Sequence, residues 1–100
     1  SERIFLDGSV NYKDGIYTGI ADAYNEDLTV TINIEDNAIT DITITSHNET
    51  PGFYEESFEE VPALIITEQT TNIDTISGAT YSSQGILLAV EEALAKATIN

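Results

Sequence analysis

The sequence predicts an α+β domain in which helices cover one face of a small antiparallel sheet. Segments with strand periodicity come first along the chain and segments with helical periodicity come last, an order typical of α+β proteins. The chain has 100 residues, of which 41% are hydrophobic, and this supplies enough apolar material for one modest core rather than two. We therefore expect a single domain.

The first thirteen residues are predicted to be an N-terminal arm or linker. Periodicity is weak over 1–13, and Asp-Gly pairs at 7–8 and 14–15 are prone to form turns. The domain proper is then expected to span 14–100.

Alternating apolar and polar residues predict three strands. A loose alternation over 16–24 predicts the first strand, and a strict alternation over 28–34 predicts the second. Turn-forming residues at 35–38 lead into a third alternating segment at 39–45, so the last two strands are expected to form a β-hairpin. Its Thr- and Asn-rich outer face is typical of a solvated surface, and no chemistry is assigned to it. The predicted buried face consists of Leu28, Val30, Ile32 and Ile34.

Two helical regions are predicted in the second half of the chain. Residues 53–67 have apolar side chains near helical spacing, but Pro62 is expected to split them into two short helices or a helix and a turn. Residues 81–97 carry an apolar stripe that predicts an amphipathic C-terminal helix. The side chains expected to face away from the core are Glu91, Glu92 and Lys96.

The composition excludes several classes of partner. Eighteen acidic residues against three basic ones leave a formal net charge of -15, which repels phosphate backbones and anionic lipid surfaces. Nucleic acid and peripheral membranes are therefore not expected as partners. No window approaches the roughly 20 apolar residues that cross a bilayer, so direct membrane insertion of this span is not expected. With no cysteine and one histidine, no metal site is expected.

The chain has neither methionine nor cysteine, and this composition bears on its origin. A chain without an initiator residue is interpreted as an excised or processed piece, or as one module of something longer. An acidic, cysteine-free module suits the outside of a cell. We therefore expect an extracellular or cell-surface location, within a larger exported or membrane-anchored protein.

The segment with the clearest chemistry is 74–83, which reads Asp-Thr-Ile-Ser-Gly-Ala-Thr-Tyr-Ser-Ser. Small and hydroxyl-bearing residues lie just ahead of the last helix, whose first N–H groups lack partners within the helix. These groups and the helix dipole stabilise a phosphate, and Gly78 and Ala79 allow it to approach closely, with Thr80 beside it. From these residues alone, the simpler interpretation is that Thr80 is an N-cap, which contributes about 1 kcal/mol.

Five residues of this segment match a family signature. In the pattern Asp-x-x-(Ser/Thr)-Gly-Ala-Thr, the chain resembles the FMN-binding domain family. That family includes the C subunit of the sodium-pumping NADH:quinone oxidoreductase, the G subunit of the related ferredoxin-oxidising complex, and extracellular flavoprotein modules. The resemblance implies that FMN is attached covalently, through a phosphodiester, to the last threonine of the signature. A magnesium-dependent flavin transferase with FAD as donor would install it. The matching residues are Asp74, Ser77, Gly78, Ala79 and Thr80.

Two further segments carry the resemblance. Residues 46–52 read Ser-His-Asn-Glu-Thr-Pro-Gly, similar to the family's Ser-His-x-Glu-Thr-Pro-Gly loop beside the flavin. Residues 14–19 read Asp-Gly-Ile-Tyr-Thr-Gly and resemble its opening Asp-Gly-x-Tyr-x-Gly strand. The resemblance extends over about 14–94, with the three matches in the family's order.

The resemblance implies roles for individual residues. The transferase is expected to recognise Asp74, Ser77, Gly78 and Ala79. Asp74 is expected to help hold its magnesium, because carboxylates suit that hard cation. Ser82 and Ser83 are weaker candidates for hydrogen bonds to the phosphodiester, the alternative being ordinary first-turn serines. A lone histidine in a polar loop is usually solvated, but within the matched loop it joins the residues expected to form the wall beside the isoalloxazine ring. These are His47, Glu49, Thr50, Pro51 and Gly52.

No catalytic residue is expected. The single histidine would have to serve every role in a nucleophile-and-base set, and no Gly-x-Gly-x-x-Gly nicotinamide fingerprint is present. The expected function is electron transfer, from a quinone-linked or flavoprotein donor to another carrier, without activity as a self-sufficient enzyme. A related possibility is an accessory domain of a larger flavin-dependent reductase. The alternative is a non-redox adhesion or spacer module outside the cell.

Overall fold

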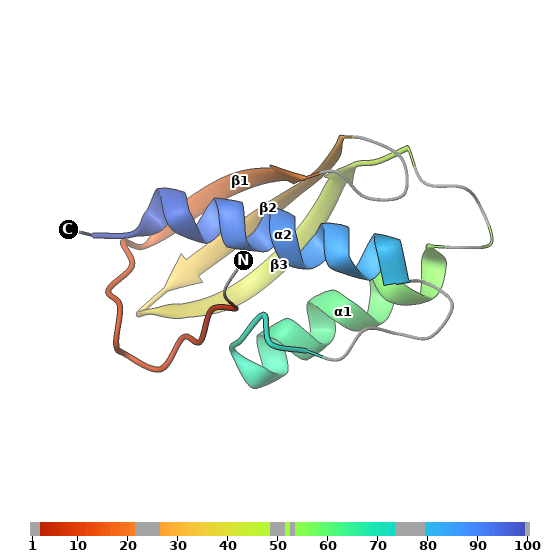
Figure 1. The fold of residues 1–100 in the computed structure, drawn as a ribbon. Coiled ribbons are helices and arrows are strands. Elements are labelled where there is room, and N and C mark those ends of the chain that lie inside the picture. The colour runs from red at the N-terminus through yellow and green to blue at the C-terminus, as the bar shows by residue number, and fades with distance from the viewer. Residues whose placement is uncertain (1–2, 22–26, 49–51, 53, 74–79, 100) are drawn as a thin grey trace.

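A computed structural model of the chain describes residues 3–21, 27–48, 52, 54–73 and 80–99, with 80–82 described by their backbone. They form a three-stranded antiparallel sheet in the order β1-β2-β3, with two helices covering one face (Figure 1). The predicted α+β class is confirmed. The elements are β1 (Gly15–Ala21), β2 (Leu28–Glu35), β3 (Ala38–Ser46), α1 (Glu55–Glu68) and α2 (Thr80–Ala97).

The core is centred on β2, the middle strand. The four residues predicted to form its buried face, Leu28, Val30, Ile32 and Ile34, are all fully buried, which confirms that prediction. The predicted hairpin is also confirmed, since β2 and β3 pair antiparallel. Asp36 and Asn37 join them with φ angles of 53° and 61°. Two successive positive φ angles are typical of a type I′ turn, whose twist matches that of a hairpin.

Small residues let α2 press closely against β1. A Cβ atom added at Gly19 would lie 1.9 Å from the carbonyl oxygen of Ala89 and 2.7 Å from the backbone nitrogen of Ala93. Both distances are shorter than any stable contact between these atoms. Only glycine therefore fits at this point of β1, and the fully buried Ala89 and Ala93 supply the matching small side chains on the helix.

The prediction that Pro62 splits the first helical region is wrong, because α1 runs unbroken from Glu55 to Glu68 with Pro62 inside it. A proline in a helix removes one backbone hydrogen bond and its ring crowds the preceding turn. Here Pro62 is buried, and its neighbours Val61 and Ile65 are fixed in the core. Packing of this apolar face holds the helix together across the missing bond.

Residues 3–13 are packed against the rest of the chain. Short β-bridges join Phe5 to Thr70 and Tyr12 to Thr98, and the backbone nitrogen of Lys13 donates to the carbonyl of Ala97 over 2.9 Å. The ring of Tyr12 is part of the hydrophobic core. The arm therefore contributes directly to the core beneath α2.

The three charged residues predicted to face away from the core of α2 behave differently from one another. Glu92 and Lys96 are exposed, and both bond to the edge strand β1. The Glu92 carboxylate accepts from the Ile20 N–H, and the Lys96 ammonium donates to the Thr18 carbonyl. For Glu91 the prediction is wrong, because its side chain is only 10% exposed and bonds with the buried Thr71 and the half-buried Arg3. Neither helix in the described part of the chain is long and apolar enough to span a membrane.

Candidate functional site

Both helices begin at the same end of the sheet (Figure 1). Strand β3 ends there at Ser46, α1 begins there at Glu55, and α2 begins there at Thr80. The end of β3 that leads into the matched loop and the start of α2 that follows the matched signature therefore lie at the same end of the sheet. We refer to it as the helix-start end.

Three aromatic rings pack together at the helix-start end. The ring of His47 lies 4.6 Å from that of Tyr54 and 4.8 Å from that of Phe58, and the last two are 4.7 Å apart. Such tilted and edge-on contacts are the arrangements that aromatic rings prefer. All three residues are half-buried, so the cluster offers apolar ring surface beside the matched loop. It is called the aromatic cluster below.

The sequence had identified His47 but not its two partners. Both partners, Tyr54 and Phe58, fall in the segment 53–67, for which the apolar spacing predicts only helix, although they come soon after the matched loop and are four residues apart. Residues four apart on a helix lie on the same face. This spacing, combined with the preceding histidine, is the signal that could have predicted the aromatic cluster.

The carboxylate of Glu55, the first residue of α1, accepts hydrogen bonds from two backbone N–H groups that precede the helix. The backbone N–H of Gly52 donates to both carboxylate oxygens of Glu55, over 2.8 Å and 2.9 Å, and the N–H of Tyr54 donates over 3.2 Å. These bonds, with the Gly52 bond foremost, lower the pKa of Glu55 below its usual value. Gly52 itself has a φ of 91°, which a glycine adopts without strain.

The first turn of α2 contains a buried hydroxyl group that has no hydrogen-bond partner among the described residues. The N–H groups of the first four residues of a helix have no acceptor within it, and α2 begins at Thr80. Ser83 is completely buried, yet its Oγ makes no hydrogen bond to any described residue. An unsatisfied buried hydroxyl costs about 1–3 kcal/mol. The first-turn N–H groups, which have no acceptor within the helix, suit an anionic ligand at this turn.

The predicted site residues divide into two groups. The first group lies in the described part of the chain. His47 belongs to the aromatic cluster, and the Gly52 N–H donates to the Glu55 carboxylate. Ser83 lies in the first turn of α2, where Thr80 and Ser82 are described by their backbone. The remaining predicted residues lie outside the described part. These are Glu49, Thr50, Pro51, Asp74, Ser77, Gly78 and Ala79.

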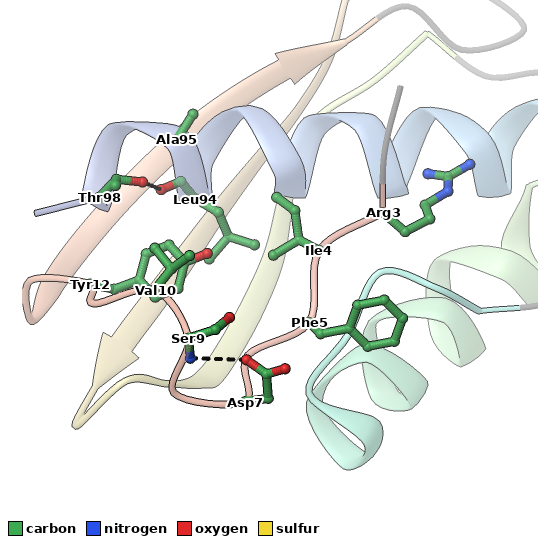
Figure 2. A pocket seen from close by; sticks show the side chains of 10 residues that line it. All are labelled: Arg3, Ile4, Phe5, Asp7, Ser9, Val10, Tyr12, Leu94, Ala95 and Thr98. Carbon is green, nitrogen blue, oxygen red and sulfur yellow. Dashed lines mark hydrogen bonds between the residues drawn. The ribbon is translucent and has the colours of Figure 1, made fainter. Parts of the chain in front are cut away.

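A separate hollow of about 450 Å³ lies between residues 3–12 and the C-terminal end of α2 (Figure 2). Burial, and secondarily the charge of Asp7, raise the pKa of Tyr12 in its wall. None of the predicted site residues lines it. The lining residues are Arg3, Ile4, Phe5, Asp7, Ser9, Val10, Tyr12, Leu94, Ala95 and Thr98.

Metal chemistry finds no support in the described residues, among which no three His, Cys, Asp or Glu side chains form a group that could hold an ion. The helix-start end instead combines an aromatic surface, first-turn helix N–H groups that lack an acceptor within the helix, and a buried hydroxyl with no partner among the described residues. These features suit a ligand with a flat ring system and a phosphate, because stacking surfaces bind the ring and donors bind the anion. A flavin mononucleotide has both parts.

Comparisons with known proteins agree with this chemistry. The protein family described as FMN-binding domain matches residues 23–95. An NADH:acrylate oxidoreductase from Vibrio harveyi is 40% identical over 85 residues, which are 85% of this chain and 8% of that protein. An uncharacterized protein of Treponema pallidum (strain Nichols) is 33% identical over 82 residues, 82% of this chain and 23% of that protein.

A third relative extends the same pattern. An NADH:fumarate oxidoreductase of Klebsiella pneumoniae (strain 342) is 29% identical over 91 residues, 91% of this chain and 10% of that protein. The chain thus spans less than a quarter of the length of each of these three relatives.

Proposed function

The chain belongs to the FMN-binding domain family, and on this premise we propose that it carries FMN bonded covalently to the side-chain oxygen of Thr80. We propose further that it relays electrons as one module of a larger oxidoreductase. The observation that carries this proposal is the buried Ser83 Oγ, which has no partner among the described residues, in the turn of α2 that begins at Thr80.

Different residues of the helix-start end would bind the phosphate and the ring system of FMN. The free N–H groups of the first turn of α2 and the Ser83 hydroxyl would hold the phosphate, which supplies the acceptor that this hydroxyl lacks. The aromatic cluster of His47, Tyr54 and Phe58 would contact the ring system. When bound, FMN supplies the one- and two-electron redox chemistry, while the protein binds and orients it.

Attachment requires one group transfer, catalysed by a magnesium-dependent flavin transferase as partner. The oxygen of Thr80 forms a bond to the phosphorus of the FMN half of FAD, and the bond between the two FAD phosphates breaks. AMP leaves, and the threonine hydroxyl loses its proton. No electron is gained or lost in this step. The covalent bond then keeps FMN on the domain without dependence on a pool of free cofactor.

The redox partners are proposed to lie in other parts of a longer polypeptide. Two relatives are oxidoreductases by name, and the matching region is 8% and 10% of their lengths. This supports a module that exchanges electrons with neighbouring cofactors rather than one that meets NADH by itself. The sequence agrees, since the chain has no nicotinamide fingerprint.

The test is intact mass after denaturation, on protein co-expressed with a flavin transferase. The native chain and Thr67→Ala, a control at an exposed threonine of α1, should each gain the mass of one FMN less one water. Thr80→Ala should gain nothing. A gain that persists in Thr80→Ala would assign the bond to another residue. No gain in the native chain, where a known substrate domain is modified, would favour the non-redox module.

A further inference from the structure

The hollow between residues 3–12 and the C-terminal end of α2 is separate from the helix-start end. Its wall includes Leu94, which lies about 21 Å from Thr80 along the axis of α2 at 1.5 Å per residue. Its volume of about 450 Å³ is within the range of small-molecule sites. The hollow is therefore large enough for a ligand of its own.

Apolar side chains form much of the wall of this hollow. Ile4 and Val10 come from the arm, and Leu94 comes from α2 (Figure 2). Leu94 is fully buried whereas Val10 is 40% exposed, so the apolar wall extends from the core to the surface. Moving apolar surface from water into such a place is favourable. A ligand that fits this wall has an apolar body.

Tyr12 brings a hydroxyl group to the same wall. The residue is 7% exposed, and its hydroxyl makes no hydrogen bond to any described residue. Burial, and then the charge of Asp7, raise the pKa of Tyr12, so the hydroxyl keeps its proton and can both donate and accept. Polar groups of buried residues are usually hydrogen-bonded. This hydroxyl is therefore suited to a polar group on a ligand.

The two charged residues of the hollow differ in how they are paired. The Arg3 guanidinium pairs with Glu91 over 3.3 Å and donates to Gln84 over 2.6 Å, so the protein itself neutralises its charge. Asp7 is exposed, and its Oδ1 accepts from the backbone N–H of the neutral Ser9 over 3.0 Å. Hydrogen bonds from Ser9, with that of its side chain foremost, lower the pKa of Asp7. Asp7 thus presents an ionised carboxylate to a ligand.

We propose that this hollow binds a small organic cation that has an ammonium group at one end, a hydroxyl group at the other, and an apolar ring between them. Asp7 pairs with the ammonium at the exposed edge, and the Tyr12 hydroxyl bonds to the hydroxyl of the ligand. The side chains of Ile4, Val10 and Leu94 cover the ring. The formal net charge of -15 agrees with a cationic ligand, because it attracts cations and repels anions.

The experiment is an NMR titration of the chain with tyramine as the probe, followed by the shifts of the backbone amides. Tyramine should shift the amides of residues 3–12 and 94–98 saturably, with a Kd of about 1 mM, an affinity suited to about ten heavy atoms. Two related probes each lack one polar group. Phenethylamine lacks the phenol hydroxyl, and tyrosol carries a hydroxyl in place of the ammonium. Each should bind about fivefold more weakly than tyramine.

Two substitutions test the polar contacts separately. Tyr12→Phe keeps the ring and removes only a hydroxyl that no described residue bonds, so the chain should fold. It should weaken tyramine about fivefold and leave phenethylamine within about twofold of native. Asp7→Asn removes the charge but can still accept from the Ser9 N–H. It should weaken both amines about fivefold and leave tyrosol within about twofold of native.

Asp41→Asn is the matched control for charge. Asp41 is an exposed aspartate of β3 whose carboxylate also accepts a hydrogen bond, from the Thr43 hydroxyl over 3.1 Å. It is not among the residues that line the hollow. This substitution changes the net charge by the same amount as Asp7→Asn, and it should leave the affinity of every probe within about twofold of native.

Three outcomes would overturn the proposal. Equal weakening of the amines by Asp7→Asn and Asp41→Asn would mean that net charge alone attracts them. Absence of saturable shifts, or shifts confined to the helix-start end, would exclude the hollow as the site. None of these outcomes depends on FMN at Thr80, so the function proposed above is tested independently.

Discussion

The two ends of α2 differ in how their polar groups are satisfied. At the C-terminal end, the Ala97 carbonyl accepts from the Lys13 N–H over 2.9 Å, and the Leu94 carbonyl accepts from the Thr98 hydroxyl over 3.2 Å. At the N-terminal end, the buried hydroxyl of Ser83 has no partner within the described residues. At the C-terminal end the chain itself satisfies these groups, whereas at the N-terminal end the described residues leave the Ser83 hydroxyl unpaired.

This difference separates stability from binding along a single helix. Buried polar groups in folded proteins are nearly always hydrogen-bonded, and exceptions occur at functional sites. The hydrogen bonds of the arm and the close contact with β1 hold the C-terminal half of α2 in place. The helix-start end can then keep an unpaired hydroxyl without unfolding the domain. Substitutions in the two regions should therefore affect different measurements.

The largest effect on stability is expected at Gly19. In Gly19→Ala the new methyl group meets the backbone of α2 at Ala89 and Ala93, so the helix and β1 must separate. Overpacking typically lowers the free energy of unfolding by about 1–3 kcal/mol. Because the new methyl group meets backbone atoms, we expect a loss of about 3 kcal/mol. The free energy of unfolding in urea is the measurement. Ile16→Ala, at a side chain 73% exposed on the same strand, should change it by less than about 0.5 kcal/mol.

The next effect is expected at Gln69, which follows α1 in a left-handed conformation. Its side-chain amide accepts from the Ile39 N–H over 2.8 Å and donates to the Ile39 and Ile66 carbonyls over 2.8 Å and 2.7 Å. Gln69→Ala leaves the Ile39 N–H and carbonyl without these bonds and should cost about 2 kcal/mol in urea unfolding. Glu68→Ala, at the exposed neighbour, serves as the control. A cost below that of the control would show that solvent replaces these bonds.

A smaller effect, of opposite sign, is expected at Ser83. Ser83→Ala removes a buried hydroxyl that has no partner in the described chain, so stability should rise by about 1 kcal/mol or stay unchanged. Non-covalent FMN affinity, measured by fluorescence titration of the unmodified chain, should fall about tenfold.

The buried Ser57 is the matched control for Ser83, because its hydroxyl donates to the Tyr54 carbonyl over 3.0 Å. Ser57→Ala should lower stability by about 1 kcal/mol, since it removes this hydrogen bond and leaves the Tyr54 carbonyl with the bond from the Phe58 N–H. If the two alanine variants destabilise equally, the contrast between the ends of α2 does not hold.

The smallest effect concerns the hydrogen bonds from the Gly52 N–H to the Glu55 carboxylate. The pKa of Glu55 lies below its usual value of 4.5 because Gly52 N–H bonds the ionised form. Because the pKa of Glu55 is lowered, the stabilisation from these hydrogen bonds is fully present above the ordinary pKa. It is lost as the pH falls through the lower pKa of the folded state. In an NMR titration, the Glu55 carboxyl carbon should have its midpoint below 4.5. The Gly52 amide should shift with the same midpoint, and Glu55→Gln should abolish that shift.

The sequence predicted the features that depend on neighbouring residues. Strict alternation identified the buried face of β2, turn residues at 36–37 identified the hairpin, and helical spacing identified α2 to within one residue of its start at Thr80. In the site, the matched loop pointed to His47 and Gly52, which the fold brings to the helix-start end. These patterns are local because they follow the periods of strands and helices.

Tertiary packing decided the remainder. Pro62 stays inside α1 because the buried side chains around it outweigh one missing hydrogen bond. Most of the Glu91 side chain is covered because its partners Arg3 and Thr71, 88 and 20 residues away along the chain, converge on it. Such contacts carry no signal at helical or strand spacing. They depend on which segments the folded chain places together, and only the assembled core specifies that.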